Sequence, residues 1–238
     1  MHYGHLLKKC STPESDSLEG EVWIGLSFAK EYRLMLSFII EATEPSLAEP
    51  LITATESRLA GNNWPIWVSD GLDAYGEALK DRHCILETYP RTGKKGRPRR
   101  PKLVACPELR YGQVVKTRDE RRRVIGVSKQ SVYGDIPLEA ISTVYIERNN
   151  LNLRHDNRRL TRKTIAFSKK VEGLKAQMTV YQAYFNFVRP HRGLAVYIPD
   201  SSNGLRKYQR RTPAIAANLT DHIWSLKELL TKKLFFNH

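Results

Sequence analysis

Two apolar runs near the start of the 238-residue chain restrict its fold most. The runs "EVWIGLSF" (21–28) and "YRLMLSFII" (32–40) are rich in branched and aromatic residues, and only "AKE" separates them. Runs of this length and spacing are typical of a β-hairpin. Because both runs are strongly apolar, at least one face of the hairpin must be buried, so we expect a sheet that other elements cover.

The segments after the hairpin alternate between helical and extended patterns. Apolar residues recur at helical spacing in the longest segment, and this helix must end near Pro190 because proline disfavours helical geometry in the residue before it. Strands interspersed with helices predict an α/β fold with a mixed sheet and flanking helices. The predicted helices are 46–61, 73–83, 141–154 and 162–189, and the predicted strands are 64–71 and 84–89.

The charge of the chain is high and unevenly distributed. The formal net charge is +14 at pH 7, which is typical of proteins that bind polyanions and unusual for enzymes of small substrates. Residues 1–90 hold 7 Lys or Arg and 14 Asp or Glu, whereas basic residues exceed acidic ones by 11 over 91–129 and by 10 over 130–238. This layout is expected when acids gather at a metal site and basic surface binds phosphates; a generally basic, soluble protein is the plainer alternative.

Residues 90–137 interrupt the regular pattern. The string "RTGKKGRPRRPK" (91–102) is too rich in Gly, Pro and basic residues to form a core, and two strand-like runs follow it around a charged turn. We interpret 90–137 as an insertion that carries a basic β-hairpin. Its "KKGRPRRPK" resembles an AT-hook, which binds a narrow minor groove, but contact with phosphates alone is the other interpretation. The predicted divisions are 1–89 (first part of the catalytic domain), 90–137 (insertion), 138–194 (its remainder) and 195–238 (helical tail).

Cysteine content and apolar content indicate a soluble protein of the cytoplasm. Cys10, Cys84 and Cys106 are far apart and include no C-x-x-C pair, so no zinc finger is expected. The N-terminal residues lack the apolar core of a signal peptide. The longest apolar stretch, around "LMLSFII", is much shorter than a membrane span. We therefore expect no membrane partner.

Two acids, Asp70 and Glu147, stand at positions where chemistry is common. Asp70 ends the apolar run "WPIWVSD", and ligands bind at the carboxyl ends of strands in such sheets. A helix cap is the structural alternative for Asp70, although Asp73 is better placed for capping. Glu147 lies in the first turn of a predicted helix, where an acid can simply complement the helix dipole. However, Arg154 follows two turns later on the same face, which suits a metal ion beside a bound phosphate.

Three motifs give the chain a family resemblance. "WVSDGLDAY", then "TVYIERNNLNLRHDNRRLTRKTIAFSKK", then "YFNFVRPHRGL" resemble, in this order, the DDE transposases of the insertion-sequence-one type. In that family a strand ends in Ser/Thr-Asp-Gly, a helix carries Glu-Arg-x-Asn followed by a basic residue, and a later helix ends in Asn-Phe-x-Arg-x-His-x-x-Leu. The resemblance extends from about Trp23 to about Leu230.

The resemblance implies an RNase H-like (integrase-type) fold and metal-dependent chemistry on DNA. Asp70 would be the second of three catalytic acids, Glu147 the third, and Arg154 the basic residue that follows. The carboxylates would hold two Mg²⁺ or Mn²⁺ ions, which prefer hard oxygen ligands and can activate a nucleophile for in-line displacement. The implied function is DNA strand cleavage and strand transfer at the ends of an insertion sequence.

The implied partner is double-stranded DNA, both the transposon ends and the target, bound by a homo-oligomer in the prokaryotic nucleoid. Basic side chains of the insertion and of the segment around Glu147 are the candidates for phosphate contact. Those after Glu147 cannot all lie on one helix face, so at least two are expected to be solvated charges. The candidate DNA-binding residues are Arg97, Arg99, Arg100, Arg148, Arg158, Arg159, Arg162 and Lys163.

The first catalytic acid of the family has no assigned counterpart here. Its Asp-Glu-apolar-aromatic motif precedes a short basic stretch, which corresponds to Lys8–Lys9, and the nearest acids come only after these lysines. The sequence therefore predicts an N-terminally truncated copy that is inactive in transposition. Two hypotheses remain: a transposase-family enzyme, and a non-catalytic DNA-binding remnant that occupies transposon ends.

Overall fold

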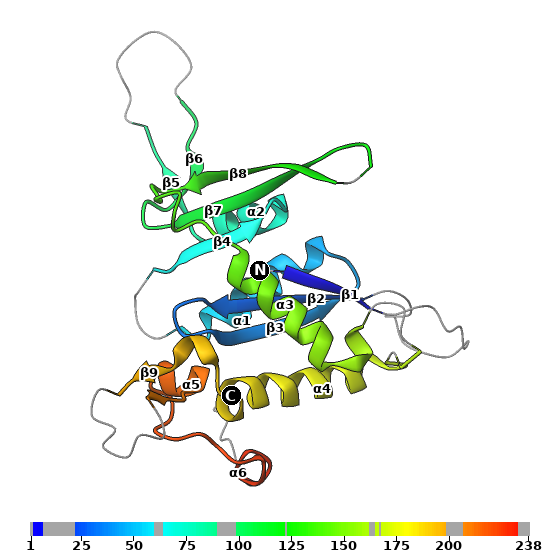
Figure 1. Ribbon diagram of the computed structural model, residues 1–238. Coiled ribbons are helices and arrows are strands. Elements are labelled where there is room, and N and C mark those ends of the chain that lie inside the picture. Colours follow the sequence, from blue (N-terminus) through cyan, green and yellow to red (C-terminus); the bar gives the residue numbers. More distant parts are fainter. Residues whose placement is uncertain are drawn as a thin grey trace.

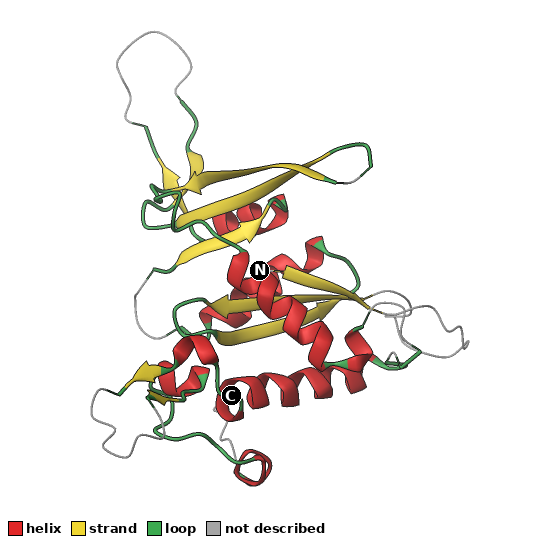
Figure 2. Ribbon diagram, viewed as in Figure 1, coloured by secondary structure: helices red, strands yellow, loops and turns green. Residues whose placement is uncertain are grey.

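The computed structural model shows an α/β protein with helices on both faces of its sheets (Figures 1 and 2). For strand β1 the description is limited to the backbone. The described residues are 2–6, 22–59, 64–89, 99–121, 123–161, 165–166, 168–198 and 207–232.

The predicted hairpin forms the centre of a three-stranded antiparallel sheet. Strands β2 (Val22–Ala29) and β3 (Leu34–Glu41) pair with each other, and β1 (His2–Leu6) pairs with β2 over Val22–Leu26. The strand order is β1-β2-β3. At the turn between β2 and β3, Arg33 adopts a φ of 54°, a left-handed conformation that is uncommon for a residue with a Cβ atom.

The second three-stranded sheet contains the first candidate acid. Strand β4 (Ile66–Asp70) runs parallel to β7 (Arg110–Arg118), and β7 runs antiparallel to β8 (Val124–Tyr133), so the order is β4-β7-β8. This sheet is mixed, as predicted. Among the described residues no strand pairing joins it to the β1-β2-β3 sheet, so the two do not form one continuous sheet.

Residues 90–137 are more than an insertion. They include β6 (Lys102–Ala105), which pairs with β5 (Cys84–Glu87) in an antiparallel hairpin. Their second part supplies β7, which is the middle strand of the mixed sheet and carries the buried side chains of Tyr111 and Val114. The hairpin expected in this region is present as β7 and β8, and its first strand lies in the core of the mixed sheet.

Different helices cover the two faces of the β1-β2-β3 sheet. Leucines of η1 (Pro45–Leu47) and α1 (Ala48–Glu56) lie 3.0–3.5 Å from the position that a Cβ on Gly25 of β2 would take, so α1 covers that face. Val22, Ile24 and Leu26 point to the opposite face, where α3 and α4 pack. The remaining helices are α2 (Asp73–Arg82), α3 (Val144–Asp156), η2 (Arg158–Leu160), α4 (Val171–Ala183), η3 (Tyr184–Val188), η4 (Arg192–Leu194), α5 (Pro213–Ala216) and α6 (Leu226–Thr231).

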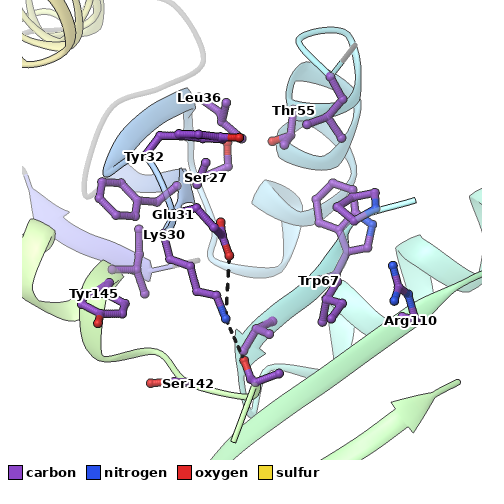
Figure 3. Close-up of a pocket in the computed structure, with 18 of the residues that line it drawn as sticks. Ser27, Lys30, Glu31, Tyr32, Leu36, Thr55, Trp67, Arg110, Ser142 and Tyr145 are labelled. Atoms are coloured by element: carbon purple, nitrogen blue, oxygen red, sulfur yellow. Dashed lines mark hydrogen bonds and ion pairs between the residues drawn. The ribbon is translucent and has the colours of Figure 1, made fainter. Parts of the chain in front are cut away.

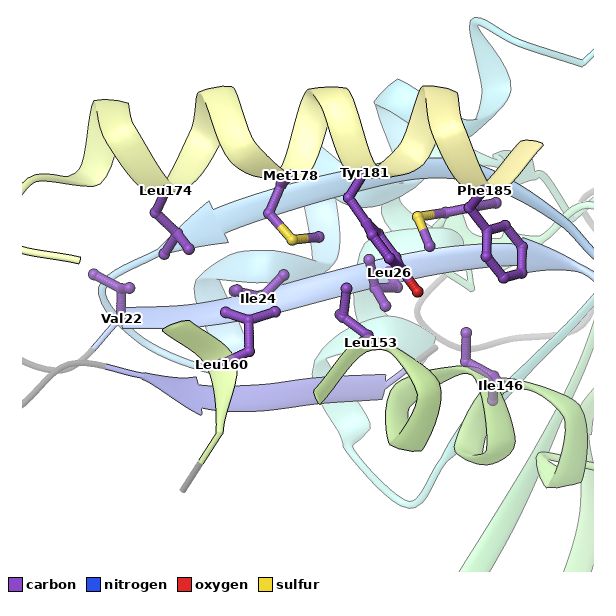
Figure 4. Packing of buried hydrophobic residues seen from close by; sticks show 11 residues of the cluster. Val22, Ile24, Leu26, Ile146, Leu153, Leu160, Leu174, Met178, Tyr181 and Phe185 are labelled. Atoms are coloured by element: carbon purple, nitrogen blue, oxygen red, sulfur yellow. The ribbon is translucent and has the colours of Figure 1, made fainter. Parts of the chain in front are cut away.

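The hydrophobic core under α3 and α4 fixes the helix that carries Glu147 (Figure 4). Leu174, Met178 and Tyr181 of α4 face β2, while α3 contributes Ile146 and Leu153 to the same cluster. Ile146 and Leu153 lie two turns apart, so they share one face of α3 and leave Glu147 on another side. Burial of these side chains therefore sets the rotation of α3 about its axis.

A second cluster joins α1 and α2 to the mixed sheet. Tyr75 and Leu79 of α2 pack with Trp67 of β4 and with Leu109 and Tyr111 around the start of β7. Trp67 and Tyr111 are paired in register and therefore point to the same face of the sheet. This face is the α2 side, and the face with Asp70 is the opposite one because side chains alternate along a strand.

The long predicted helix ends where expected but begins later. α4 starts at Val171, and the π-helical turn η3 continues it to Val188, directly before Arg189 and Pro190. Within η3, Asn186 accepts a hydrogen bond from Met35 N–H at 3.0 Å and donates one to Met35 C=O at 2.9 Å. Asn186, from the motif "YFNFVRPHRGL", thus pairs with the backbone of β3 as a neighbouring strand would.

Candidate active site

Asp70 and Glu147 lie on the same side of the mixed sheet. Asp70 is the last residue of β4 and is in register with Val114 of β7. Val114 packs with Ile136 and Ile141, in the segment that leads into α3. Side chains in register on adjacent strands point to one face, so Asp70 points toward the side on which α3 begins. Sequence positions 77 apart are thus brought to one surface.

Neither Asp70 nor Asp73 acts as the N-cap of α2. That position is held by Leu72, which has extended backbone geometry and makes no side-chain capping bond. Asp73 is the first helical residue rather than the cap, so that part of the sequence interpretation is wrong. Asp73 instead places a negative charge in the first turn, where it complements the helix dipole.

Lys116 contacts Glu147 directly. Its Nζ lies 2.5 Å from Glu147 Oε1, and Thr143 Oγ1 donates a hydrogen bond to the same oxygen at 2.9 Å. Both side chains of the ion pair are about one-third exposed, at 30% and 35%. Lys116 follows Val114 by two residues on β7 and thus belongs to the face of Asp70. The carboxylate of Glu147 therefore binds a cation in this structure, supplied by the protein itself.

Sequence reasoning missed Lys116, although a signal for it exists. Once "RYGQVVKTR" (110–118) is read as a strand, alternation assigns Lys116 to the same face as Val114. The interpretation of this segment as part of an insertion removed that signal. The site consequently contains a basic residue from β7 as well as the predicted Arg154 from α3.

A chain of hydrogen bonds holds the end of β4 against β7 and β8. Gln130 donates to Gln113 at 2.9 Å, and Gln113 donates to the Tyr111 hydroxyl at 2.9 Å. The Tyr111 and Ser69 hydroxyls are 2.6 Å apart, and Ser69 Oγ donates to the backbone carbonyl of Asp70 at 2.6 Å. Burial raises the pKa of Tyr111 to about 12, so its hydroxyl keeps its proton. This chain fixes the backbone at Asp70 from the opposite face of the sheet.

The side of α3 that faces the sheet includes two buried asparagines. Asn149 and Asn150 are 2% and 5% exposed. Both amide atoms of Asn149 and the Nδ2 of Asn150 have no hydrogen-bond partner within the part of the chain that the structure describes. Both asparagines belong to the buried side of α3 that also carries Ile146 and Leu153, and not to the side of Glu147.

The predicted DNA-binding residues occupy several surfaces. Arg148, Arg158 and Arg159 are exposed on and after α3, and Arg159 donates a hydrogen bond to Ser168 at 3.2 Å. Arg154 is half-buried, and its backbone carbonyl accepts a hydrogen bond from Thr161. Two further predicted residues, Arg99 and Arg100, are exposed just before β6. The Arg99 guanidinium lies 4.3 Å from the centroid of the Tyr89 ring. Arg97, Arg162 and Lys163, with the acids Glu14, Asp16, Glu19 and Glu21, lie outside the described residues.

A pocket of about 430 Å³ lies between the β2–β3 hairpin and β4, but the two acids do not line it (Figure 3). Its cations serve the scaffold: Lys30 donates to the carbonyl of Ala140 at 3.3 Å, and Arg110 donates to the carbonyl of Trp64 at 2.7 Å. The rest of its lining is largely apolar, with Tyr32, Trp67 and Tyr145 among the rings. We therefore place the candidate active site at the acids and not in this pocket.

The donors at the acid site suit a hard divalent cation. Two carboxylates share one face, and one of them already holds an ammonium group at contact distance. Carboxylate oxygens are the preferred ligands of Mg²⁺ and Mn²⁺. Within the described ranges, no group of three or more His, Cys, Asp or Glu side chains could hold a metal ion.

Comparison with known protein families gives one match. Residues 125–187 match the IS1 transposase family model. The matched segment includes Glu147, Arg154 and Asn186, which confirms the family resemblance over the second motif and the start of the third, while the motif with Asp70 lies outside the match. The IS1 transposase match implies DNA binding and a role in DNA transposition.

No curated protein and no solved structure matches the chain. The IS1 transposase segment is therefore the basis for its assignment. The structure shows a mixed α/β arrangement around this segment, and none of the helices that it describes has the length and apolarity needed to cross a bilayer.

Proposed function

We propose that this chain catalyses metal-dependent DNA strand cleavage and strand transfer at the ends of an insertion sequence. The observation that carries the proposal is the common face of Asp70 and Glu147, with the Lys116 ammonium 2.5 Å from the Glu147 carboxylate. We further propose an RNase H-like fold. The support for it is the mixed sheet with α2 on one face and the start of α3 near the other.

Asp70 and Glu147 would hold the divalent cations. When bound, Mg²⁺ or Mn²⁺ supplies Lewis acidity toward the phosphodiester and makes a water or a 3′-hydroxyl a better nucleophile. In each step a new oxygen–phosphorus bond forms while the bond to the leaving 3′ oxygen breaks. The same pair of carboxylates would serve cleavage by water and joining by a DNA 3′ end.

The residues around the acids position them. Thr143 donates a hydrogen bond to Glu147 and thereby limits the rotation of its carboxylate. The hydrogen-bond chain that ends at the carbonyl of Asp70 does the same for the strand end. Lys116 would hold Glu147 in the absence of a cation and bind a DNA phosphate in its presence, because an ammonium group forms charge-assisted hydrogen bonds with either anion.

Arg154 and the exposed arginines would bind the DNA backbone. Arg154 lies two helical turns after Glu147, at a distance along α3 that suits the next phosphates of a strand held at the acids. Arg148, Arg158, Arg159, Arg99 and Arg100 would contribute phosphate contacts that position the duplex without reading its sequence. The same role is proposed for Arg97, Arg162 and Lys163.

A cleavage assay tests the proposal. Purified protein is incubated with Mg²⁺ or Mn²⁺ and with labelled linear DNA that carries the ends of the insertion sequence encoding it. We expect cleavage at those ends, contrary to the inactivity predicted from the sequence. Asp70→Asn or Glu147→Gln should lower the cleavage rate by about 100-fold or more, because each removes a ligand that stabilises developing charge. Asp73→Asn, which changes an acid three residues from Asp70, is the matched control and should cleave normally.

The alternative from the sequence is a non-catalytic protein that binds transposon ends. The two-ligand face within the described residues gives this alternative its specific support. Binding of the ends without cleavage, unchanged by Asp70→Asn and Glu147→Gln, would favour it and overturn the catalytic proposal. The inactivity predicted from the sequence would then hold as well.

A further inference from the structure

A second polar site lies beyond the C-terminal end of α4 and η3. A pocket of about 840 Å³ is lined by residues just after Pro190 and by residues around the short strand β10 (Tyr208–Gln209). β10 pairs with β9 (Val196–Tyr197). His191 N–H donates to the carbonyl of Arg211 at 2.9 Å, and Arg211 Nε donates to the carbonyl of Leu194 at 2.9 Å. These bonds join the segment after Pro190 to the segment after β10.

The pocket is strongly basic. Arg192, Lys207 and Arg210 line it and are exposed. Within the described ranges none of the three forms an ion pair with an acid. Three cations in one concave surface repel each other, so the arrangement favours an anionic ligand.

His191 adds a directed donor to these charges. Its Nδ1 accepts a hydrogen bond from Gly193 N–H at 3.2 Å, so the neutral ring carries its proton on Nε2. Burial lowers the pKa of His191, and the charges of Arg33 and Arg189 lower it further. Among the described residues, the acid Asp156 pairs with Arg189 and accepts a hydrogen bond from Tyr181.

An exposed aromatic ring accompanies the cations. Tyr208 lines the pocket and is 58% exposed, and the ring of Tyr197 meets it edge to face with 5.5 Å between centroids. The T-shaped contact supports the Tyr208 ring without covering both of its faces. Phosphate-binding cations beside an exposed ring are the combination that proteins use for unpaired nucleotides, because a base inside a duplex is already stacked.

The pocket is connected to the helix of Glu147 through Arg33. The Arg33 guanidinium stacks on the ring of Tyr145, in the first turn of α3, with 3.5 Å to the centroid. The same guanidinium acts electrostatically on His191. Arg33 has a strained left-handed backbone, which its stacking on Tyr145 can offset. Arg33 therefore lies between the first turn of α3 and the segment of His191 and Gly193, which borders the pocket.

We propose that this pocket binds an unpaired nucleotide of a DNA strand, with the base on Tyr208 and the phosphates on Arg192, Lys207 and Arg210. The inference rests on the proposed function for DNA as the ligand, and it requires neither the metal site nor cleavage. Its ligand differs from the duplex phosphates assigned to the arginines of α3.

Fluorescence anisotropy in EDTA tests the proposal with two labelled probes, a 15-nucleotide oligo(dT) and a blunt duplex. Tyr208→Ala should weaken oligo(dT) binding by about 5- to 100-fold, the effect of losing one stacked base, and change duplex binding less than twofold. Tyr208→Phe should bind as the unaltered protein does, because stacking needs the ring and not the hydroxyl. Tyr32→Ala, which removes an exposed tyrosine elsewhere, is the matched control.

The cations give a second readout. Arg192→Ala with Arg210→Ala should reduce the slope of log affinity against log salt for oligo(dT) by about 0.7 for each phosphate that the protein no longer neutralises. Equal weakening of both probes by the arginine changes, with no effect of Tyr208→Ala, would overturn the proposal and leave a plain phosphate-binding surface. If the unaltered protein does not cleave DNA but still binds oligo(dT) in a way that depends on Tyr208, the proposed function is refuted and the proposal for the pocket stands.

Discussion

Lys116 of β7 and Glu147 of α3 form an ion pair, with 2.5 Å between Nζ and Oε1. The pair joins the mixed sheet to the helix that carries the IS1 transposase motif. Because Glu147 is also the proposed metal ligand, the ammonium of Lys116 and a divalent cation compete for one carboxylate. This competition distinguishes a metal site from a purely structural ion pair.

Replacement of Lys116 should therefore strengthen metal binding. Lys116→Met removes one positive charge about 4 Å from a divalent cation at Glu147, which is worth about 2 kcal/mol in water, so Mn²⁺ affinity should rise about 30-fold. Lys116→Arg keeps the charge and should bind Mn²⁺ as the unaltered protein does. Isothermal titration calorimetry measures both variants. Weaker Mn²⁺ binding by Lys116→Met would show that Lys116 supports the metal site instead of competing with it.

Tyr111 should make stability fall in strong alkali. Its pKa is raised to about 12 in the folded protein, above the usual value near 10, so the folded state holds this proton more tightly. The resulting stabilisation is fully present below pH 10 and is lost as pH rises through 12. Absorbance at 295 nm should show Tyr111 among the tyrosines that ionise late, together with Tyr181, whose pKa burial also raises, and Tyr111→Phe should remove only the part of the signal due to Tyr111.

Tyr111→Phe should also destabilise the protein at neutral pH by about 1–3 kcal/mol, because Ser69 and Gln113 lose a buried hydrogen-bond partner. Urea denaturation measures the change. Tyr145→Phe, which removes the hydroxyl of a half-exposed ring, is the control. If Tyr111→Phe is as stable as the unaltered protein, the hydrogen-bond chain does not hold the end of β4.

Asn186 should be required for the attachment of the long helix to β3. Asn186→Ala leaves the buried N–H of Met35 without its partner, which should cost about 1–3 kcal/mol in the free energy of unfolding. Asn186→Asp keeps the acceptor for Met35 N–H but loses the donor to Met35 C=O. Its loss of stability should therefore depend on pH, unlike that of Asn186→Ala, because the new carboxyl group can donate only when it is protonated. Thr179→Ala, on the exposed side of α4, is the control. A loss below about 0.5 kcal/mol for Asn186→Ala would contradict the role assigned to this side chain.

His191 should make the protein less stable in mild acid. Its folded pKa is lowered from about 6.5, mainly by burial, so the unfolded chain takes up the proton first as pH falls. The stability that neutral His191 contributes is present above pH 6.5 and is lost as pH falls through the lower folded value. Thermal denaturation between pH 7.5 and 5.5 should therefore show a shallower decline for His191→Gln. Parallel curves for the two proteins would rule this out.

Several features could be predicted from local chemistry. The hairpin of β2 and β3 follows from two apolar runs, and the end of the long helix follows from Pro190, which cannot continue it. Asp70 at the end of a strand and Glu147 in the first turn of a helix also lie where predicted. These features depend on residues close in sequence, so a single sequence contains the information.

Features that depend on distant contacts could not be predicted. β7 is a core strand because it pairs with β4 and buries Tyr111, yet its charged flanks suggested an insertion. The pairing of Lys116 with Glu147 and of Asn186 with Met35 depends on tertiary packing over separations of 31 and 151 residues. The helix start at Val171 likewise differs from the apolar pattern, which continues further toward the N-terminus.

The central claim is that Asp70 and Glu147 form one site for divalent cations, and Mn²⁺ titration followed by electron paramagnetic resonance tests it most directly. We predict that Asp70→Asn and Glu147→Gln each weaken binding at the same site by tenfold or more, that the double variant loses little beyond either, and that Asp73→Asn binds normally. Unchanged Mn²⁺ binding by either single variant, in protein with an unaltered melting temperature, would contradict the claim.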